Sequence, residues 1–333
     1  MATITTEQYL ALSQFAYNNF NASDVGEPHA TISWLIDNYP VEHKGDPQFA
    51  YIFSLLDEIG DWKLIGFQPN TSNGFAAMAF QAPDPKDENG NPILDVEGMP
   101  VRGDQVFALR GTEPKWNTML ADGFTDLGVA LGNFVPQFND AVEFFNEVRE
   151  DYPSASYSFT GHSLGGGLAQ YMTYITDGIG YSETFNAISP VPVIKSRDPN
   201  FESNWSSFYD RSIDHVNSND WVGMYHGADL GQTKRYIGNG GADYTKVNFD
   251  ALASMLYIRL QIKEGTMDSV AGWAKLNEYK RNVNGIVSNG ADGFSPSDTW
   301  DVFAGYAGTE GYAGGGFLNT SHHGLETFLV DDT

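Results

Sequence analysis

The sequence predicts an α/β fold, with a mainly parallel β-sheet and helices on both of its faces. The first observation is that short apolar segments alternate with longer amphipathic ones along the 333 residues. The second is a G-x-S-x-G pentapeptide at residues 161–165, with Ser163 at its centre. Residues 155–160 alternate apolar and small polar side chains before it, and small residues open a helix after it. A strand, a tight turn and a helix in this order present a serine hydroxyl at the end of a sheet.

The elements before this turn are a helix, a hairpin and an acidic loop. Residues 6–20 have the pattern of an amphipathic helix with a threonine N-cap. Residues 62–68 and 74–81 alternate on either side of a turn sequence and predict a β-hairpin near the edge of the sheet. Residues 84–95 are acidic and rich in turn formers. Because their oxygen ligands do not have the spacing of an EF-hand, we interpret them as a solvated loop.

The remaining elements continue the alternation of strands and helices. Residues 105–109 form a buried strand that ends at an Arg-Gly-Thr sequence, and residues 138–150 form a helix with one apolar face. Residues 183–188 and 213–217 are further strands after the pentapeptide. No repeat or linker divides the sequence, so we expect residues 1–333 to form a single domain.

The composition excludes several classes of partner and chemistry. Lys and Arg number 18, Asp and Glu number 43, and the formal net charge is −25. Such a surface repels anionic polymers, so nucleic acid is excluded as a partner. The chain has no cysteine, which excludes disulfides, thiol catalysis and thiolate metal sites.

The termini and the hydropathy pattern bear on location. The first residues contain no basic segment followed by an apolar one, so no secretory signal is recognised. No uncharged apolar run approaches the roughly 18 residues that a membrane span requires. We therefore expect no stable membrane span and secretion without a cleaved N-terminal signal, with a cytoplasmic location as the alternative. The sequence predicts no oligomeric state.

Ser163 is interpreted as a nucleophile, because glycines flank it where the turn leaves no room for side chains. The alternative is a Gly-rich turn of a parallel sheet in which Ser163 merely caps the following helix. A phosphate-binding loop is disfavoured because no lysine follows the glycines at the Walker spacing.

A serine nucleophile needs a base, and chain order limits the choice of histidine. In folds that carry this turn, the acid follows the serine and the base follows the acid. Of the seven histidines, three come no later than residue 162 and so precede the serine. His215 lies inside a predicted strand. His226 lies only six residues after Asp220, the preferred acid, which is too close for the next connection of the sheet. The base is therefore His322 or His323.

The acid should lie on a loop beyond a strand that follows the turn. Asp220 lies just beyond residues 213–217 and meets this condition, although an Asx turn would also explain it. Asp214 is the alternative, at the start of the strand and so at the wrong end of a parallel sheet. For the oxyanion hole, one N–H is expected from Leu164 and the other from residues 111–112, where the Thr112 hydroxyl orients the loop or adds a donor.

Together these residues resemble the class 3 lipase family, which has an α/β-hydrolase fold and includes fungal triacylglycerol lipases and bacterial lipases and phospholipases A1. The matching motifs follow the family's order over about residues 100–330: ALRGT at 108–112, DGFTDL at 122–127, TGHSLGG at 160–166, TFNA at 184–187, VNSNDWV at 216–222 and HGLETF at 323–328. The resemblance implies Ser163 as nucleophile, Asp220 as acid and His323 as base. It also implies Thr112 and Leu164 as the oxyanion hole.

One spacing departs from the family. Asp220 and His323 are far apart, so about residues 230–315 are expected to include a cap or an insertion. The apolar-rich segment 251–258 is either that cap or an ordinary packed helix. The lid of the fungal members corresponds to roughly residues 113–124.

The resemblance implies a lipid carboxylic-ester hydrolase of the triacylglycerol lipase type that forms an acyl-enzyme. Its partner would be a lipid or ester substrate at an interface, and no metal or organic cofactor would be needed. A phospholipase A1 or a short-chain esterase is the alternative enzyme. A catalytically silent hydrolase fold that binds lipid is the alternative without catalysis.

Overall fold

This computed structural model describes residues 4–41, 44–45, 50–110, 125–153, 156–176, 180–198, 200–201, 205–217, 230–236, 268 and 271. Within these ranges one mixed sheet contains seven strands: β1 (Lys63–Gln68), β2 (Ala76–Gln81), β3 (Gln105–Arg110), β4 (Tyr157–His162), β5 (Tyr181–Phe185), β6 (Ser212–Asn217) and β7 (Gln232–Tyr236). The strands lie in the order of the sequence. Neighbours from β1 to β3 are antiparallel, and neighbours from β3 to β7 are parallel.

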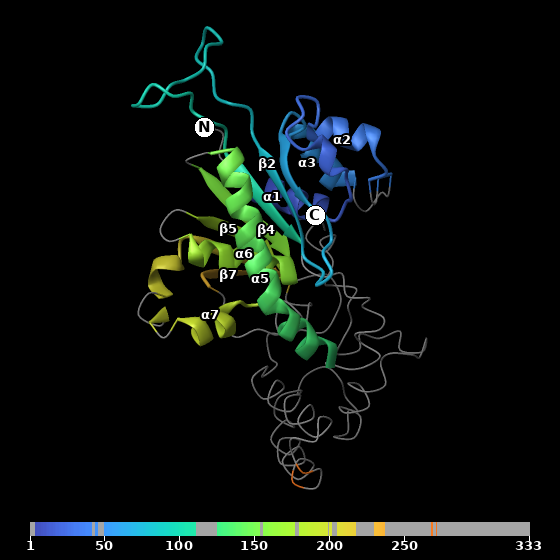
Figure 1. Ribbon diagram of the computed structural model, residues 1–333, viewed down its shortest axis with the longest axis vertical. Coiled ribbons are helices and arrows are strands. Elements are labelled where there is room, and N and C mark those ends of the chain that lie inside the picture. The colour runs from blue at the N-terminus through green and yellow to red at the C-terminus, as the bar shows by residue number, and fades with distance from the viewer. Residues whose placement is uncertain are drawn as a thin grey trace.

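Three helices that connect neighbouring parallel strands cover one face of the sheet (Figure 1). They are α5 (Thr125–Asp151), α6 (Leu164–Ile175) and α7 (Val191–Arg197). Connections between parallel strands are right-handed, so successive steps in one direction along the sheet place their helices on the same face. Phe107, Phe138, Phe159 and Leu168 belong to the core between these helices and the sheet.

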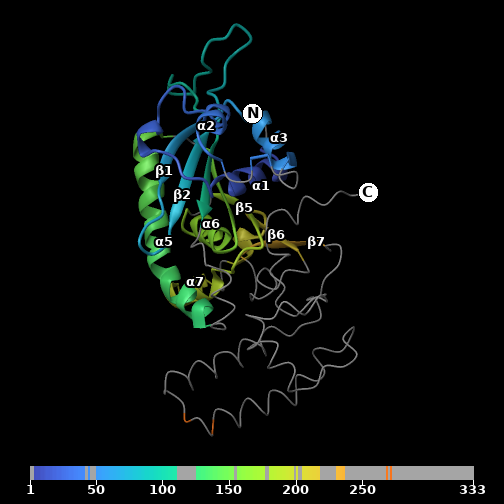
Figure 2. The same cartoon turned by 90° about the vertical axis from the view of Figure 1, so that its right-hand side faces the viewer.

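The opposite face needs a cover from elsewhere in the chain, and the N-terminal helices supply it (Figure 2). They are α1 (Thr6–Phe15), α2 (Ile32–Asn38) and α3 (Ala50–Glu58). Side chains alternate along β3, so Val106 packs with the N-terminal helices and Phe107 packs with α5. Helices on both faces of a mainly parallel sheet confirm the predicted fold class. Short 3₁₀ helices, η1 (Ala22–Asp24) and η3 (Trp205–Phe208), lie in the connections.

The predicted elements before Ser163 are confirmed, but some have different ends. α1 ends at Phe15 rather than at residue 20, and the N–H of Tyr17 then bonds to the carbonyl of Gln14 over 3.1 Å. The hairpin of β1 and β2 lies at the sheet edge, as expected. α5 begins before the predicted residue 138 and includes Pro136, which removes one N–H from the helix without ending it.

Two strands differ from the prediction after Ser163. β5 lies earlier than residues 183–188, because Asn186 has a positive φ of 46° and leaves the strand. β7 was not predicted, because its polar sequence QTKRY lacks an alternation of apolar side chains. It occupies the first part of the range in which an insertion is expected. Apart from residues 268 and 271, the remainder of that range lies outside the described residues.

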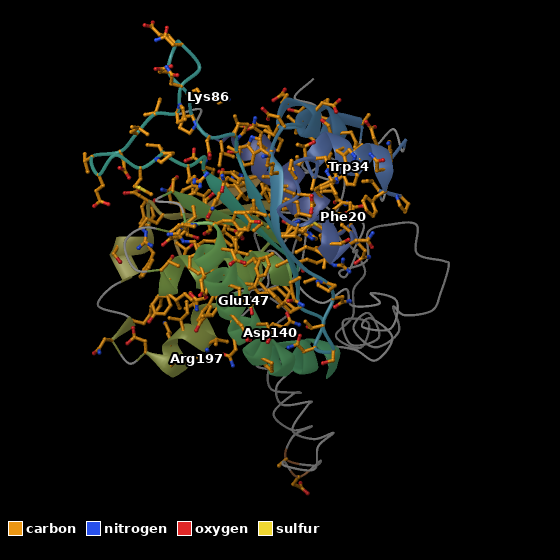
Figure 3. All side chains as sticks on the ribbon, turned by 45° about the horizontal axis from the view of Figure 1, so that its top comes forward. Phe20, Trp34, Lys86, Asp140, Glu147 and Arg197 are labelled. Carbon is orange, nitrogen blue, oxygen red and sulfur yellow. The ribbon has the colours of Figure 1, made fainter. Side chains whose placement is uncertain are left out.

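Residues 82–104 form an arm that projects from the body of the protein between β2 and β3; Lys86 lies on it (Figures 1 and 3). Each of its two turns is organised by an aspartate. Asp87 accepts backbone N–H groups from Asn89 and Asn91, and Asp95 accepts those of two residues of the second turn. The interpretation as a solvated loop is confirmed. The arm leads into the start of β3 and so leaves the sheet at the end opposite to Ser163.

Candidate active site

Ser163 lies at the junction of β4 and α6, where the parallel strands have their carboxyl ends. Its backbone has φ 57° and ψ −123°, a conformation that glycine adopts readily and other residues adopt only with strain. Within the described ranges, Ser163 and Asn186 are the non-glycine residues with positive φ. Such strain persists where the surrounding structure enforces it, and it clusters at functional sites. The tight turn that the sequence predicts is therefore confirmed.

Backbone hydrogen bonds hold Ser163 on both sides of its Cα atom. Its N–H donates to the carbonyl of Phe185 over 3.0 Å. Its carbonyl accepts from the N–H of Ile188 over 3.0 Å and from that of Gly167 over 3.2 Å. Phe185 ends β5 and Ile188 follows it, so the neighbouring strand and its loop enforce the strained conformation.

The glycines of the turn are required by close packing. A Cβ atom on Gly161 would lie 2.5 Å from the carbonyl carbon of Gly165 and 2.6 Å from the carbonyl oxygen of Leu109. A Cβ atom on Gly166 would lie 2.6 Å from the Cβ of Ala187. Real Cβ atoms do not approach other heavy atoms this closely, so α6 packs against β4 and the loop after β5 only because these residues are glycines.

The Ser163 side chain does not cap the helix. Ser163 occupies the N-cap position of α6, but its hydroxyl makes no capping hydrogen bond. The capping contact that the alternative assigns to the Ser163 side chain is therefore wrong. The residue is 6 % exposed, less than the turn alone suggests.

The start of α6 is suited to stabilising negative charge. The first N–H groups of a helix have no acceptor within the helix, and they carry the positive end of its dipole. Leu164 is the first residue of α6 and directly follows Ser163. An oxyanion that formed next to Ser163 would therefore lie at a favourable electrostatic position.

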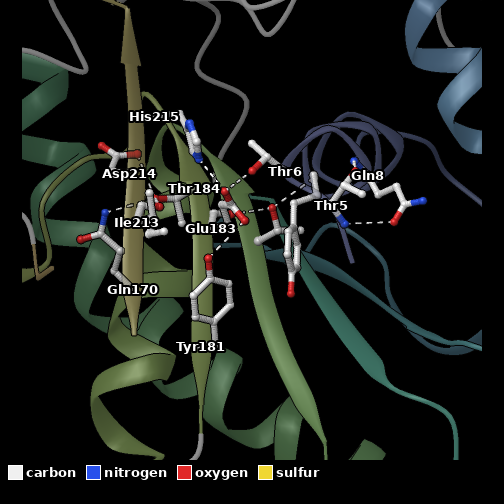
Figure 4. Close-up of polar contacts among 12 residues, drawn as sticks. Thr5, Thr6, Gln8, Gln170, Tyr181, Glu183, Thr184, Ile213, Asp214 and His215 are labelled. Carbon is white, nitrogen blue, oxygen red and sulfur yellow. Dashed lines mark hydrogen bonds and ion pairs between the residues drawn. The ribbon is translucent and has the colours of Figure 1, made fainter. Parts of the chain in front are cut away.

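Asp214, the alternative acid, accepts hydrogen bonds from residues of β5 and the loop that follows it. Its Oδ1 atom accepts a hydrogen bond from the hydroxyl of Thr184 over 2.9 Å and from the N–H of Ala187 over 3.3 Å (Figure 4). Asp214 pairs in register with Thr184, which pairs with Gly161, so it lies before the level of Ser163 in the sheet. The buried carboxylate thus supports the loop that hydrogen-bonds to the Ser163 carbonyl.

His215 lies inside β6, as the sequence predicts, and its imidazole contacts a buried carboxylate. Its Nε2 atom lies 2.7 Å from Oε1 of Glu183, which also accepts the hydroxyl of Thr6 over 2.5 Å (Figure 4). Tyr181 donates to the other carboxylate oxygen over 3.2 Å. Sequence reasoning missed this cluster. Its signal is that two adjacent strands of a parallel sheet carry ionisable residues among buried ones, Glu183 on β5 and Asp214 and His215 on β6.

The contacts of Glu183 determine its ionisation. Burial raises the pKa of the carboxyl, but its contacts with His215, Thr6 and Tyr181 together lower it more, so the pKa lies below its ordinary value. The pKa of Tyr181 is raised by burial and by the charge of Glu183. A charged carboxylate therefore lies next to the neutral phenol of Tyr181 and joins α1 to β5 and β6.

The other predicted site residues lie outside the described residues. These are Asp220, His323 and Thr112, as well as the alternative base His322 and the lid segment. Of the predicted site, the structure describes Ser163 and Leu164, which the turn places next to each other.

The described part of the chain has two further features that bear on chemistry. It contains no group of three His, Asp or Glu side chains that could hold a metal ion. None of its helices combines the length and the hydropathy that crossing a membrane requires.

Residues 96–190 match the family model described as a phospholipase-like, Tle-like phospholipase domain. The matched stretch includes β3, β4, the Ser163 turn and α6. No curated protein matches the chain.

The chain is also similar to solved structures, at low identity. For MDLA from Penicillium cyclopium, the identity is 13 % and the TM-score 0.42, over 71 % of this chain and 80 % of that one. For lipase II from Rhizopus niveus, the identity is 14 % and the TM-score 0.35, over 66 % of this chain and 75 % of that one. A triacylglycerol lipase with a serine-protease triad at its catalytic centre has 17 % identity and a TM-score of 0.36, over 65 % of this chain and 71 % of that one.

Over residues 96–190 the chain matches a phospholipase-like family model, in line with the expected resemblance, and the mainly parallel sheet with helices on both faces has the predicted α/β architecture. At a general level, the phospholipase-like match indicates a hydrolase of lipid esters.

Proposed function

We propose that this protein hydrolyses carboxylic esters of lipids through an acyl-enzyme intermediate on Ser163. The observation that carries the proposal is the backbone of Ser163, with positive φ at the start of α6 and a hydroxyl that makes no cap. A serine that served only to begin a helix would adopt an extended conformation and use its side chain as a cap. A strained and uncapped serine is what a nucleophile on this turn requires.

In the proposed mechanism, the Ser163 hydroxyl attacks the ester carbonyl while the His323 imidazole removes its proton. Asp220 orients the imidazole and stabilises the imidazolium that forms. His323 then donates the proton to the leaving alcohol, and water attacks the acyl-enzyme with His323 again as the base.

The developing oxyanion is assigned to the N–H of Leu164 and to Thr112. Leu164 is at the positive end of α6, which favours the charge of the tetrahedral intermediate. Removing one donor of an oxyanion hole typically costs about 10²- to 10³-fold in kcat. The assignment of Thr112 rests on its sequence motif.

A phospholipase A1 is the second candidate, and the phospholipase-like match of residues 96–190 favours it. Both candidates use the same chemistry and differ in the alcohol that leaves. The reaction is assigned to a lipid–water interface, outside the cell that produces the protein. Short-chain ester hydrolysis and a silent, lipid-binding fold are the other outcomes to be distinguished.

The test combines a fluorophosphonate probe with three substrates: a short-chain p-nitrophenyl ester, a triacylglycerol emulsion and phosphatidylcholine vesicles. We expect the probe to label the parent protein but not Ser163→Ala. We also expect hydrolysis by Ser163→Ala to fall by roughly a thousandfold or more. Ser54→Ala, at an exposed helical serine, is the matched control and should behave like the parent.

The substrate panel separates the candidates. Release of fatty acid from vesicles faster than from the emulsion indicates a phospholipase, and the reverse indicates a lipase. Activity of Ser163→Ala within tenfold of the parent would rule out the serine mechanism. A folded parent that neither reacts with the probe nor cleaves any ester would be a silent hydrolase fold.

A further inference from the structure

Tyr17, just beyond the end of α1, contacts both strand ends that border the Ser163 turn. Its hydroxyl lies 3.1 Å from Nδ1 of His162, the residue before Ser163. Its backbone carbonyl accepts a hydrogen bond from Nη1 of Arg110 over 3.0 Å. The Arg110 guanidinium also lies over the Tyr17 ring, 5.3 Å from its centroid.

Arg110 and His162 are neighbours in the sheet. They lie opposite each other in the parallel ladder of β3 and β4, and each is the last residue of its strand. Both are buried, with 3 % and 8 % of their surface exposed. Because paired residues point to the same face of a sheet, one side chain packed on that face can contact both. Tyr17 therefore bridges the two strand ends.

These strand ends lead directly into the proposed catalytic groups. Ser163 follows His162, and the segment assigned to the oxyanion hole, residues 111–112, follows Arg110. Tyr17 is itself held in place after α1. Its N–H bonds to the carbonyl of Gln14 over 3.1 Å, and the Asn18 side chain donates to the carbonyl of Phe15 over 2.9 Å.

We infer that Tyr17 is a positioning residue for the proposed hydrolysis, which acts by fixing His162 and thereby the peptide that carries Ser163. The inference rests on the proposed function. The peptide between His162 and Ser163 sets φ of Ser163 and hence the direction of its hydroxyl. A hydrogen bond to the His162 side chain restrains rotation of that peptide. Without it, the hydroxyl spends less time in line with the ester carbonyl, so acylation slows while substrate affinity is unchanged.

The chain offers a matched control on α1, the helix that precedes Tyr17. The buried hydroxyl of Tyr9 donates to Oγ of Ser158 over 2.9 Å. Ser158 is on β4, as is His162, but lies near the start of that strand. Tyr9→Phe therefore removes a tyrosine hydroxyl between α1 and β4, as Tyr17→Phe does, at the far end from Ser163.

The test measures the second-order rate constant of fluorophosphonate labelling, and kcat and KM on a short-chain ester. We expect Tyr17→Phe to slow labelling and lower kcat by about 3- to 10-fold, the range of one net hydrogen bond, with KM unchanged. Tyr9→Phe should have a lower melting temperature but the parent's kcat. In a His162→Phe background, Tyr17→Phe should cause no further loss, because the two residues act through one contact.

Each contrary result has a distinct meaning. Rates for Tyr17→Phe equal to the parent's would overturn the positioning role, as would an equal loss in Tyr9→Phe. A change in KM with the labelling rate unchanged would make Tyr17 a substrate contact instead. Additive losses in the double variant would show that Tyr17 does not act through His162. A folded parent that is inert to probe and ester would contradict the proposed function itself, and the positioning role with it.

Discussion

The Nε2 atom of His215 lies 2.7 Å from Oε1 of Glu183, and both side chains are almost completely buried. The hydroxyl of Thr6, the first residue of α1, donates to the same oxygen over 2.5 Å. One carboxylate therefore connects the N-terminal helix to two adjacent parallel strands. The face of the sheet opposite to α5, α6 and α7 is fastened by a polar contact as well as by apolar packing.

Glu183→Gln should destabilise the protein and change its pH dependence. A hydrogen bond to a charged group typically contributes about 1.5–3 kcal/mol to stability. The pKa of Glu183 is lower in the folded protein than its ordinary value of about 4.5, so its contribution is complete above that pH. The contribution is lost as the pH falls through the folded pKa. Urea unfolding should show the full difference between parent and variant at pH 7 and a shrinking difference in acid.

The control for this variant is Glu147→Gln, at an exposed position of α5 (Figure 3). It should change the free energy of unfolding by no more than about 0.5 kcal/mol at any pH. A Glu183→Gln protein as stable as the parent at pH 7 would contradict the stabilising role of the contact with His215.

Ser163→Gly should be more stable than Ser163→Ala, by about 1 kcal/mol or more. Alanine keeps a Cβ atom at φ 57° and ψ −123°, whereas glycine adopts this conformation without a clash. Both variants lack the hydroxyl and should be equally inactive. Thermal unfolding of the two proteins measures the difference. Equal stabilities would mean that the turn stores no strain.

Asp220→Asn should reduce activity far more than Asp214→Asn. If Asp220 stabilises the imidazolium, the loss should approach the four orders of magnitude, roughly, that this change causes in a serine protease. Asp214→Asn keeps an oxygen for Thr184 and Ala187, so its main effect should be a lower melting temperature. Steady-state kinetics on a short ester, together with melting curves, distinguish the two. A larger kinetic loss in Asp214→Asn would make it the acid.

His323→Ala should be as inactive as Ser163→Ala, because members of a triad act as one unit and their removal is not additive. His322→Ala should retain most of the parent's activity. Labelling by the fluorophosphonate probe reports the same contrast independently of substrate. The reverse pattern would move the base by one residue and contradict the match of the HGLETF motif.

The turn around Ser163 could be predicted from sequence because its causes are local. Glycines at 161 and 166 are fixed by steric contacts that any strand-turn-helix of this kind makes. The strand before it and the helix after it follow from side-chain periodicity. The alternation of strands and helices likewise predicted a parallel sheet.

The contacts of Glu183 and Tyr17 could not be predicted, because they join segments far apart in the chain. Glu183 meets Thr6 and His215 only after α1 packs on the sheet. Tyr17 looks like one apolar position of an amphipathic helix until α1 ends at Phe15 and leaves its hydroxyl facing His162. β7 is a polar strand at the edge of the sheet within the described residues, and its sequence carries no signal of period two.

The final prediction concerns the charge of the substrate surface. A net charge of −25 should oppose binding to an anionic bilayer, and salt at 0.1 M screens this repulsion beyond roughly 10 Å. We therefore expect faster turnover on zwitterionic than on anionic vesicles of matched acyl chains, with the difference narrowing as salt rises. A local basic charge could reverse this preference for zwitterionic vesicles, and Lys234 is exposed on β7. Lys234→Gln should leave the preference for zwitterionic vesicles intact if total charge decides. A preference for anionic vesicles at low salt that disappears in Lys234→Gln would show that this local charge outweighs the total.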